Sequence, residues 1–372
     1  MLWLLLPLVL YAFYLWTVTA FALRQPSASE GRPPGAPVRV LVPMRNEASN
    51  IEQCIRGLCS QQLWRNADVE LLVIDDHSTD DSLQLADSAL QSCPFPAQVL
   101  QLPEAFVGKK AALAYAILQQ PEDAIILTTD ADCTHPGNWI RTMASSFDAH
   151  TQVVCAPVRL VGNSVFAQWQ ELEFAGLMAL TAGHIRMGFP SLANGANFSF
   201  RKAAYSAVEG YNAAREVASG DDMLLMHKIA TQFGTDTVRF VDAPTATVYT
   251  PAEPTLRTFW HQRLRWVSKA DAYTSFSTVV SQTLAWLGGS LPVIYSLLVV
   301  LVQLPLWLIG LAWTLKLLAE LPLLVHGAWR YGRKKTLLWL PILQPVQAVY
   351  TLLIGPAGVL TRHYTWKDRR TR

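Results

Sequence analysis

Two aspartates one residue apart, Asp130 and Asp132, follow an apolar run at residues 124–128. Carboxylate oxygens are the ligands that Mg²⁺ prefers, and this ion commonly keeps substrate phosphates in its coordination shell. The pair could therefore hold a divalent cation that bridges two phosphate groups. The same pattern also describes a strand-end turn with two solvated acids, and the pair alone leaves both interpretations open.

Two further groups of polar residues could bind parts of a nucleotide. Asp75 and Asp76 end the apolar run at residues 69–74, where one carboxylate could hold a ribose hydroxyl or a base edge. The alternative is helix capping. Gly108-Lys109-Lys110 opens a helical stretch, and a helix N-terminus with an added lysine favours an anion. A solvated lysine pair is the other interpretation.

An acidic pair in the second half of the chain could supply a base. Asp222, in the sequence Gly220-Asp221-Asp222, stands at the start of a helical run. A carboxylate there could take the proton of an acceptor hydroxyl as a general base. Acids at a helix start also complement the helix dipole without any chemistry.

One face of a predicted helix could bind a leaving group, because Gln262, Arg265 and Trp266 stand at i, i+3 and i+4. Arginine binds a diphosphate in a fork, and tryptophan stacks on a sugar or an acceptor. The alternative is a juxtamembrane amphipathic helix whose basic residues meet lipid headgroups. Both interpretations can hold together, because an apolar window follows directly.

The elements that must position these residues alternate between strand and helix. Four β-branched-rich runs predict strands at 38–43, 69–74, 124–128 and 153–156, and helices are predicted at 48–61, 80–91 and 109–119. This alternation predicts an α/β fold with a mainly parallel sheet covered on both faces. Ligands bind beyond the carboxyl ends of such strands, where the polar residues gather. Residues 194–197 could line an acceptor pocket or form a turn, and the helix expected at 166–186 is assigned no chemistry.

Charge is distributed unevenly along the 372 residues. The chain has 30 basic and 28 acidic residues, and this near-balance argues against a nucleic-acid partner. No Asp, Glu, Lys or Arg occurs in residues 1–23, 272–315 or 336–361. Each window is long enough for a membrane helix, and we therefore expect a lipid bilayer as a partner, with a soluble domain between membrane segments.

Basic residues after the first window place the soluble domain on the cytoplasmic side of a cell membrane, in a multi-pass protein. Lys316 and Glu320 either pair inside a second helix or lie where that helix ends. The third C-terminal segment either spans the membrane or re-enters it. The expected organisation is an anchor at 1–23, a linker at 24–37, a catalytic domain at 38–254, an interface helix at 255–272, two transmembrane helices within 281–327, a hydrophobic segment at 336–361 and a basic tail at 362–372.

The five cysteines are Cys54, Cys59, Cys93, Cys133 and Cys155. Their number is odd and no Cys-x-x-Cys pair occurs, so we expect neither a disulfide framework nor a zinc site. A reducing compartment fits this pattern.

Taken in order, these motifs resemble a membrane-anchored family 2 glycosyltransferase with the GT-A fold, in which a Rossmann-like sheet domain is flanked by transmembrane helices. The matching segments are Val42–Glu47, Asp75–Asp80, Gly108–Leu113, Asp130–Asp132, Gly220–Asp222 and Gln262–Trp266. The last is the QxxRW pattern, which is similar to that of cellulose-synthase-like, hyaluronan-synthase-like and ceramide-glucosyltransferase-like enzymes. The family usually has Glu-Asp at the base motif, whereas this chain has Asp221-Asp222.

The resemblance implies inverting transfer of a hexosyl or N-acetylhexosaminyl group from a nucleotide-diphosphate sugar, expected to be a UDP-sugar. It implies that Asp75 contacts the nucleotide, with Arg45, Glu47 and Lys109 near the base, ribose or diphosphate. Asp130 and Asp132 would hold Mg²⁺ or Mn²⁺ with the diphosphate. Asp222 would be the base. Gln262, Arg265 and Trp266 would close over the diphosphate and the acceptor.

The expected acceptor is lipid-like and membrane-borne, because three or four hydrophobic segments form a poor polymer channel unless the protein oligomerises. A processive polysaccharide synthase is the first alternative. An inactive membrane scaffold with a GT-A-like domain is the second. Metal-dependent hydrolysis of a nucleotide sugar would distinguish an enzyme from a scaffold.

Overall fold

The computed structural model describes residues 5–24, 35–211, 221–268, 276–360, 364–366 and 369–371. The chain divides into two compact units. One unit combines Met1–Arg24, Leu160–Ser191 and Ala252–Tyr364, and the other combines Gln25–Arg159, Leu192–Pro251 and Thr365–Arg372. Residues 160–191, which we expected within the 38–254 domain, thus belong to the unit that holds the apolar helices.

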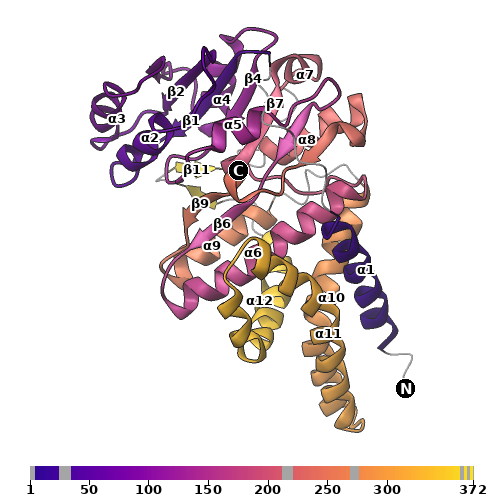
Figure 1. The fold of residues 1–372 in the computed structure, drawn as a ribbon. Helices are drawn as coiled ribbons and strands as arrows, with labels where there is room; N and C mark the ends of the chain where they lie inside the picture. Colours follow the sequence, from indigo (N-terminus) through magenta and orange to yellow (C-terminus); the bar gives the residue numbers. More distant parts are fainter. Residues whose placement is uncertain are drawn as a thin grey trace. The chain divides into compact units, whose positions relative to one another are not determined.

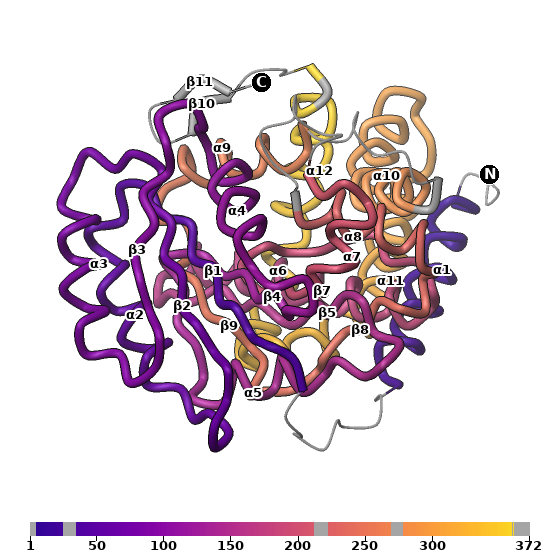
Figure 2. The backbone as a smooth tube through the Cα atoms, turned by 90° about the horizontal axis from the view of Figure 1, so that it is seen from above, coloured from indigo at the N-terminus to yellow at the C-terminus, as the bar shows by residue number. Residues whose placement is uncertain are grey.

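A seven-stranded sheet is the centre of the second unit, with the strand order β3-β2-β1-β4-β7-β5-β8 (Figure 2). β7 runs antiparallel to β4 and β5, whereas β1–β2, β1–β4, β2–β3 and β5–β8 are parallel, so the sheet is mainly parallel as predicted. The strands are β1 (Val38–Met44), β2 (Val69–Asp75), β3 (Ala97–Gln101), β4 (Ile125–Thr128), β5 (Val153–Cys155), β7 (Phe198–Arg201) and β8 (Val238–Phe240).

Helices cover this sheet, and every residue of β1 and β4 is buried. Burial of both faces is why these strands read as continuous apolar runs rather than as alternating ones. The helices of this unit are α2 (Ile51–Cys59), α3 (Ser82–Leu90), α4 (Lys109–Leu118), α5 (Trp139–Ala144), α7 (Lys202–Ala207) and α8 (Asp221–Phe233). Shorter elements are η2 (Gly195–Asn197), η4 (Thr235–Thr237), η5 (Pro244–Ala246), β6 (Val158–Val161), β9 (Val248–Pro251) and β11 (Arg369–Thr371).

The four predicted strands are β1, β2, β4 and β5, and the three predicted helices are α2, α3 and α4, each with small shifts at its ends. The prediction missed β3, β7 and β8. β3 lies at the edge of the sheet and is partly exposed, so its sequence carries no continuous apolar run. β7 and β8 alternate apolar and polar residues over four and three positions, so neither carries a continuous apolar run.

The first unit is helical (Figure 1). α11 packs against α1, α6 and α10, and α12 packs against α9 and α10. Its elements are α1 (Leu6–Ala22), α6 (Val165–Arg186), α9 (Leu256–Val267), α10 (Phe276–Leu301), α11 (Trp307–Arg330), η7 (Lys334–Trp339) and α12 (Leu340–Leu360), and β10 (Tyr364–Trp366) begins at its last residue.

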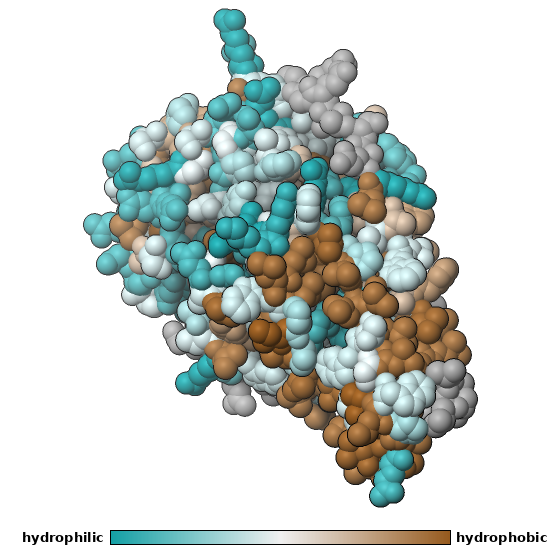
Figure 3. Space-filling model, turned by 60° about the horizontal axis from the view of Figure 1, so that its bottom comes forward, coloured by the Kyte–Doolittle hydropathy of each residue, from teal (hydrophilic) through white to brown (hydrophobic). Residues whose placement is uncertain are grey.

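Three helical segments are long and apolar enough to cross a membrane: Thr278–Leu301, Trp307–Arg330 and Lys334–Gly358. α1 is a shorter apolar helix of 17 residues. Many apolar side chains of α10, α11 and α12 are exposed to the surroundings, among them Leu301, Trp307 and Ile342, and apolar residues gather on the face shown in Figure 3. Such a surface is typical of contact with lipid rather than with water.

Lys316 and Glu320 pair inside α11, with 2.6 Å between Nζ and Oε2, so the first of the two interpretations is correct. The Lys316 side chain is fully buried and also donates to Gln344 of α12, whose amide donates to Glu320. Tyr11 of α1 donates to the same carboxylate. Each charge therefore has a partner, which an ionisable residue in an apolar helix bundle requires.

Cys59 and Cys93 form a disulfide, contrary to the expectation from the cysteine pattern. The two residues are 34 positions apart, and packing of α2 on α3 brings their Cα atoms to 4.9 Å. Spacing along the chain carries no information about such an approach. Cys54, Cys133 and Cys155 are buried free cysteines.

Several expected segments lie partly or wholly outside the described residues. Residues 25–34 are most of the expected linker, and residues 212–220 include the glycine of the acidic motif. Residues 269–275 include the end of the expected interface helix, and residues 361–363, 367–368 and 372 include much of the expected basic tail.

Candidate active site

The candidate site lies where the strand order reverses in the second unit. β1 pairs with β2 on one side and with β4 on the other, so the chain passes from β1 to β2 and β3 on one side and then crosses to β4 on the other. Such switch points form the ligand-binding crevice of open α/β sheets. Asp75 ends β2, and the segment containing Asp130 and Asp132 follows β4 at the same edge.

Hydrogen bonds tie the loops after β1 and β2 together. Arg45 donates from Nη1 to the carbonyl oxygens of Asp76 and His77, at 2.7 Å each. The backbone N–H of Glu47 donates to Ser82 Oγ at 2.7 Å. Arg45 therefore helps to shape the loop beside Asp75, and its contact with a nucleotide stays a prediction.

Lys109 connects the helix-opening motif to the acidic pair. Its Nζ forms an ion pair with Asp130 Oδ1, and both side chains are about one-third exposed. Gly108 precedes it with φ of 99°, a left-handed conformation that strains any residue with a Cβ atom. The Gly108 N–H donates to Asp76 Oδ1 at 3.1 Å, so Asp76 sets the start of α4 and thereby the position of Lys109.

Asp132 lies in a concentration of negative charge. Burial, together with the charges of Asp130 and Glu47, raises the pKa of Asp132 to about 6. Thr250 Oγ1 donates to its Oδ2 at 3.2 Å. Clustered carboxylates that repel one another fit a bound cation, because the cation removes the repulsion.

The donor set also fits the metal that the resemblance implies. No group of three or more His, Cys, Asp or Glu residues that could hold a metal ion occurs in the described part of the chain. Asp130 and Asp132 by themselves would leave coordination positions for substrate phosphate and water, as Mg²⁺ sites in phosphate-binding enzymes do. Burial raises the pKa values of the neighbouring Cys54 and Cys133 thiols, so these remain protonated and are poor ligands.

Asp222 is the second residue of α8, and its carboxylate accepts hydrogen bonds from two backbone N–H groups. Its Oδ2 accepts from Gly195, and its Oδ1 accepts from Met223 at 2.8 Å. A Cβ atom built on Gly195 would lie 3.4 Å from both Asp222 Oδ2 and Lys109 Nζ. The carboxylate of Asp222 and the ammonium group of Lys109 thus flank the same glycine, which places Asp222 beside the Lys109–Asp130 pair.

The loop at residues 194–197 contains Gly195 and is itself held in place by hydrogen bonds. Thr128, the last residue of β4, donates to the Gly195 carbonyl at 3.0 Å. Asn197 is buried, accepts from Trp139 Nε1 at 3.0 Å and donates to the carbonyls of Pro157 and Ala246 at 2.7 Å each. The loop is therefore fixed to the sheet edge rather than being a simple surface turn.

Models of two related families match the chain. Glycosyl transferase family 2 matches residues 39–208, and glycosyl transferase family group 2 matches residues 125–354, which is more than half of the chain. The chain belongs to glycosyl transferase family group 2. The acidic residues described above therefore lie in the sheet domain of a glycosyltransferase.

The sequence of this glycosyltransferase is similar to those of two curated proteins. Beta-monoglucosyldiacylglycerol synthase from Synechocystis sp. is 26% identical over 234 residues, which are 62% of this chain and 47% of the relative. Glycosyltransferase AglE from Haloferax volcanii is 28% identical over 128 residues, which are 34% of this chain and 39% of that protein. The chain thus matches less than half the length of either relative.

A solved structure shares the fold of the glycosyltransferase. The mannosyltransferase PcManGT from Pyrobaculum calidifontis, in complex with GDP-Man and Mn²⁺, superposes with a TM-score of 0.58 at 18% identity. The match covers 94% of this chain and 96% of the mannosyltransferase. At this identity the likeness shows the fold alone, which is the GT-A Rossmann-like fold with a mainly parallel sheet.

The structure brings together most of the site residues that the sequence indicated. Glu47, Lys109, Asp130, Asp132 and Asp222 form the cluster described above, whereas Arg45 lies in an adjoining loop and Asp75 at the end of β2. The remaining predicted residues, Gln262, Arg265 and Trp266, lie on α9 in the helical unit. Thr250 and Gly195 were missed as site residues. Gly195 lies in a polar loop that the sequence did mark, whereas nothing near Thr250 in the sequence indicates contact with Asp132.

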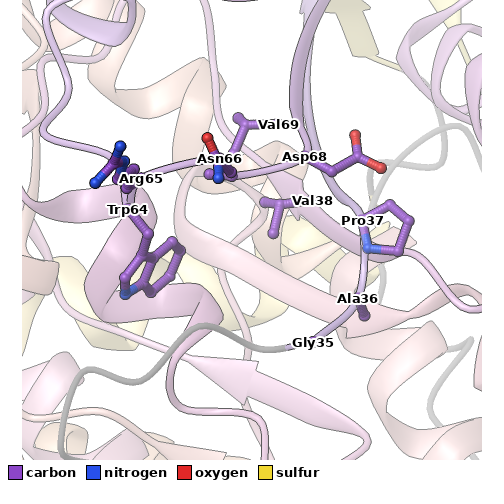
Figure 4. A pocket seen from close by; sticks show the side chains of 10 residues that line it. Gly35, Ala36, Pro37, Val38, Trp64, Arg65, Asn66, Asp68 and Val69 are labelled. Carbon is purple, nitrogen blue, oxygen red and sulfur yellow. The ribbon is translucent and has the colours of Figure 1, made fainter.

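A pocket of about 250 Å³ lies elsewhere in the glycosyltransferase domain. It is at the amino ends of β1 and β2, where Trp64, Arg65, Asp68 and Pro37 line it (Figure 4). The motif residues follow the carboxyl ends of the same strands. This pocket is therefore separate from the candidate active site.

We expect Asn197→Ala to destabilise the domain. The change leaves Trp139 Nε1 and the Ala246 carbonyl without the Asn197 amide, and each unsatisfied buried group costs about 1–3 kcal/mol. The Pro157 carbonyl keeps the Val248 N–H as a donor. Thermal unfolding in detergent should show a clearly lower midpoint. Asn163→Ala, at an exposed position, is the matched control and should unfold like the wild type. An unchanged midpoint for Asn197→Ala would contradict the structural role of this side chain.

Proposed function

We propose that this glycosyltransferase moves a single hexosyl or N-acetylhexosaminyl group, with inversion, from a UDP-sugar to a lipid-like acceptor in a membrane. The observation that carries the proposal is the position of Asp222 beside the Lys109–Asp130 pair, next to the buried Asp132. This arrangement offers a base on one side and groups for a diphosphate on the other.

In the proposed reaction, Asp222 accepts the proton of the acceptor hydroxyl, whose oxygen forms a new bond to the anomeric carbon. The bond from that carbon to the diphosphate oxygen breaks, and the diphosphate leaves with the electron pair. Lys109 lies close enough to Asp130 to place positive charge at the leaving group. A Mg²⁺ or Mn²⁺ ion held by Asp130 and Asp132 would add Lewis-acid stabilisation of the same charge.

We assign nucleotide contacts to Asp75, with Arg45 and Glu47 in the adjoining loops. Gln262, Arg265 and Trp266 are assigned to the diphosphate and the acceptor. Support for a metal comes from the mannosyltransferase of the same fold, whose structure contains Mn²⁺ and GDP-Man. Support for a lipid acceptor comes from the name of the Synechocystis relative, a monoglucosyldiacylglycerol synthase, and from three helices apolar enough to cross a membrane. The location that we propose is the cell membrane, where the protein would span the bilayer several times with its catalytic domain in the cytoplasm.

The test uses the purified full chain in lipid nanodiscs with Mn²⁺. Each of UDP-glucose, UDP-galactose, UDP-N-acetylglucosamine and GDP-mannose is combined with diacylglycerol or with a total membrane lipid extract. We expect one donor to yield a discrete lipid that is heavier by a single sugar in mass spectrometry. A long polymer would instead support the processive synthase, and absence of turnover with every donor and either metal would support the scaffold.

A further inference from the structure

A buried ion pair in the helical unit joins α6 to α9. Glu173 Oε2 and Arg263 Nη2 are 2.6 Å apart, and their side chains are 19% and 3% exposed. A buried ion pair gains little net stability, because desolvation offsets most of the attraction. A role in geometry is therefore the better explanation for its presence.

Arg263 contacts both ends of the Gln262–Trp266 motif. Its Nη1 donates to Gln262 Oε1 at 2.7 Å. The guanidinium carbon lies 4.1 Å from the centre of a Trp266 ring and 4.6 Å from that of Phe259. A planar guanidinium can make a hydrogen bond, an ion pair and ring contacts at once, whereas a lysine ammonium group cannot.

The side-chain amide of Gln262 forms a second hydrogen bond through its nitrogen. Its Nε2 donates to Glu253 Oε1 at 2.8 Å. The backbone N–H and C=O of Glu253 both bond to the side chain of Gln170 on α6, at 3.0 and 2.9 Å. Gln170 is fully buried. Because an amide nitrogen carries two N–H groups, the second can still donate to a phosphate oxygen.

We propose that Arg263, held by Glu173, is a positioning residue that sets the side-chain conformations of Gln262 and Trp266. Two polar residues of α6, Gln170 and Glu173, thus hold the residues that contact the motif, although we assigned this helix no chemistry from its sequence. This inference rests on the proposed function of α9 at the diphosphate and acceptor. Misplacement of a binding group by about 1 Å can reduce a rate by about 10²-fold.

The experiment compares steady-state kinetics of Arg263→Lys and Glu173→Gln in the full chain, with the donor and acceptor found above. Arg263→Lys keeps the positive charge but removes the planar guanidinium group with its several N–H donors. We expect kcat/KM to fall by about 10- to 100-fold in this variant, with less loss in Glu173→Gln, which keeps a hydrogen-bond acceptor. Glu52→Gln removes the exposed ion pair Glu52–Arg56 on α2 and is the matched control, expected to leave the kinetics unchanged.

A double-mutant cycle separates positioning from a general structural role. We expect Arg263→Lys to cause no further loss once Gln262 and Trp266 are both replaced by Ala, because nothing is left to position. An equal loss in both backgrounds would overturn the inference. Full activity of the Gln262→Ala and Trp266→Ala variants would overturn it as well. The second result would also remove the assignment of Gln262 and Trp266 to the diphosphate and the acceptor, whereas neither result bears on the roles of Asp132 and Asp222, which their own variants test.

Discussion

Asp222→Asn should abolish sugar transfer while donor binding persists. Asparagine has nearly the same shape and can still accept a hydrogen bond from the Gly195 N–H, but it cannot take up the acceptor proton. Loss of a general base reduces kcat by about 10²- to 10⁴-fold. The measurements are kcat from released UDP in the presence of the acceptor, and donor affinity by isothermal titration calorimetry with Mn²⁺.

Two comparison variants make this result specific. Asp222→Glu keeps the carboxylate but displaces it, and we expect part of the activity to remain. Asp87→Asn makes the same chemical change at an exposed position on α3 and should behave as the wild type. If Asp222→Asn weakened donor binding as much as it slowed transfer, Asp222 would be a binding residue rather than the base.

We expect Asp132→Asn to remove metal-dependent activity. Asp132 shares its surroundings with the negative charges of Asp130 and Glu47, and the proposed metal ion would neutralise this cluster and the leaving diphosphate together. Without the second carboxylate, kcat/KM should fall by about 100-fold or more. Electron paramagnetic resonance of free Mn²⁺ should show weaker binding of the ion in the presence of UDP.

The control for this variant lies at the other end of the same strand. Asp123 is exposed just before β4, whereas Asp132 follows that strand, and Asp123→Asn should leave Mn²⁺ binding and turnover unchanged. EDTA should abolish the turnover of the wild type, and added Mn²⁺ should restore this turnover. Undiminished turnover of the wild type in EDTA would rule out the metal site.

The strands that surround the site could be predicted because they are almost entirely buried. β1, β2 and β4 are mainly apolar on both faces, so each appears in the sequence as an apolar run, interrupted only by Arg39 in β1 and Glu70 in β2, and polar residues follow it. The edge strand β3 and the short strands β7 and β8 lack this signal. The Cys59–Cys93 disulfide was missed for a related reason, since it depends on how α2 packs on α3.

The sequence by itself determined which chemical groups this glycosyltransferase carries and that they follow parallel strands. Parallel strands bring their carboxyl ends to one edge, so Asp75, Asp130 and Asp132 had to gather there. Only the tertiary structure decided that Asp222 reaches this edge through Gly195, and that Thr250 contacts Asp132. These contacts join residues far apart in the chain through backbone hydrogen bonds and packing, which leave no local pattern. The same holds for α6, whose Gln170 and Glu173 contact Glu253 and Arg263, residues about 80 to 90 positions further along the chain.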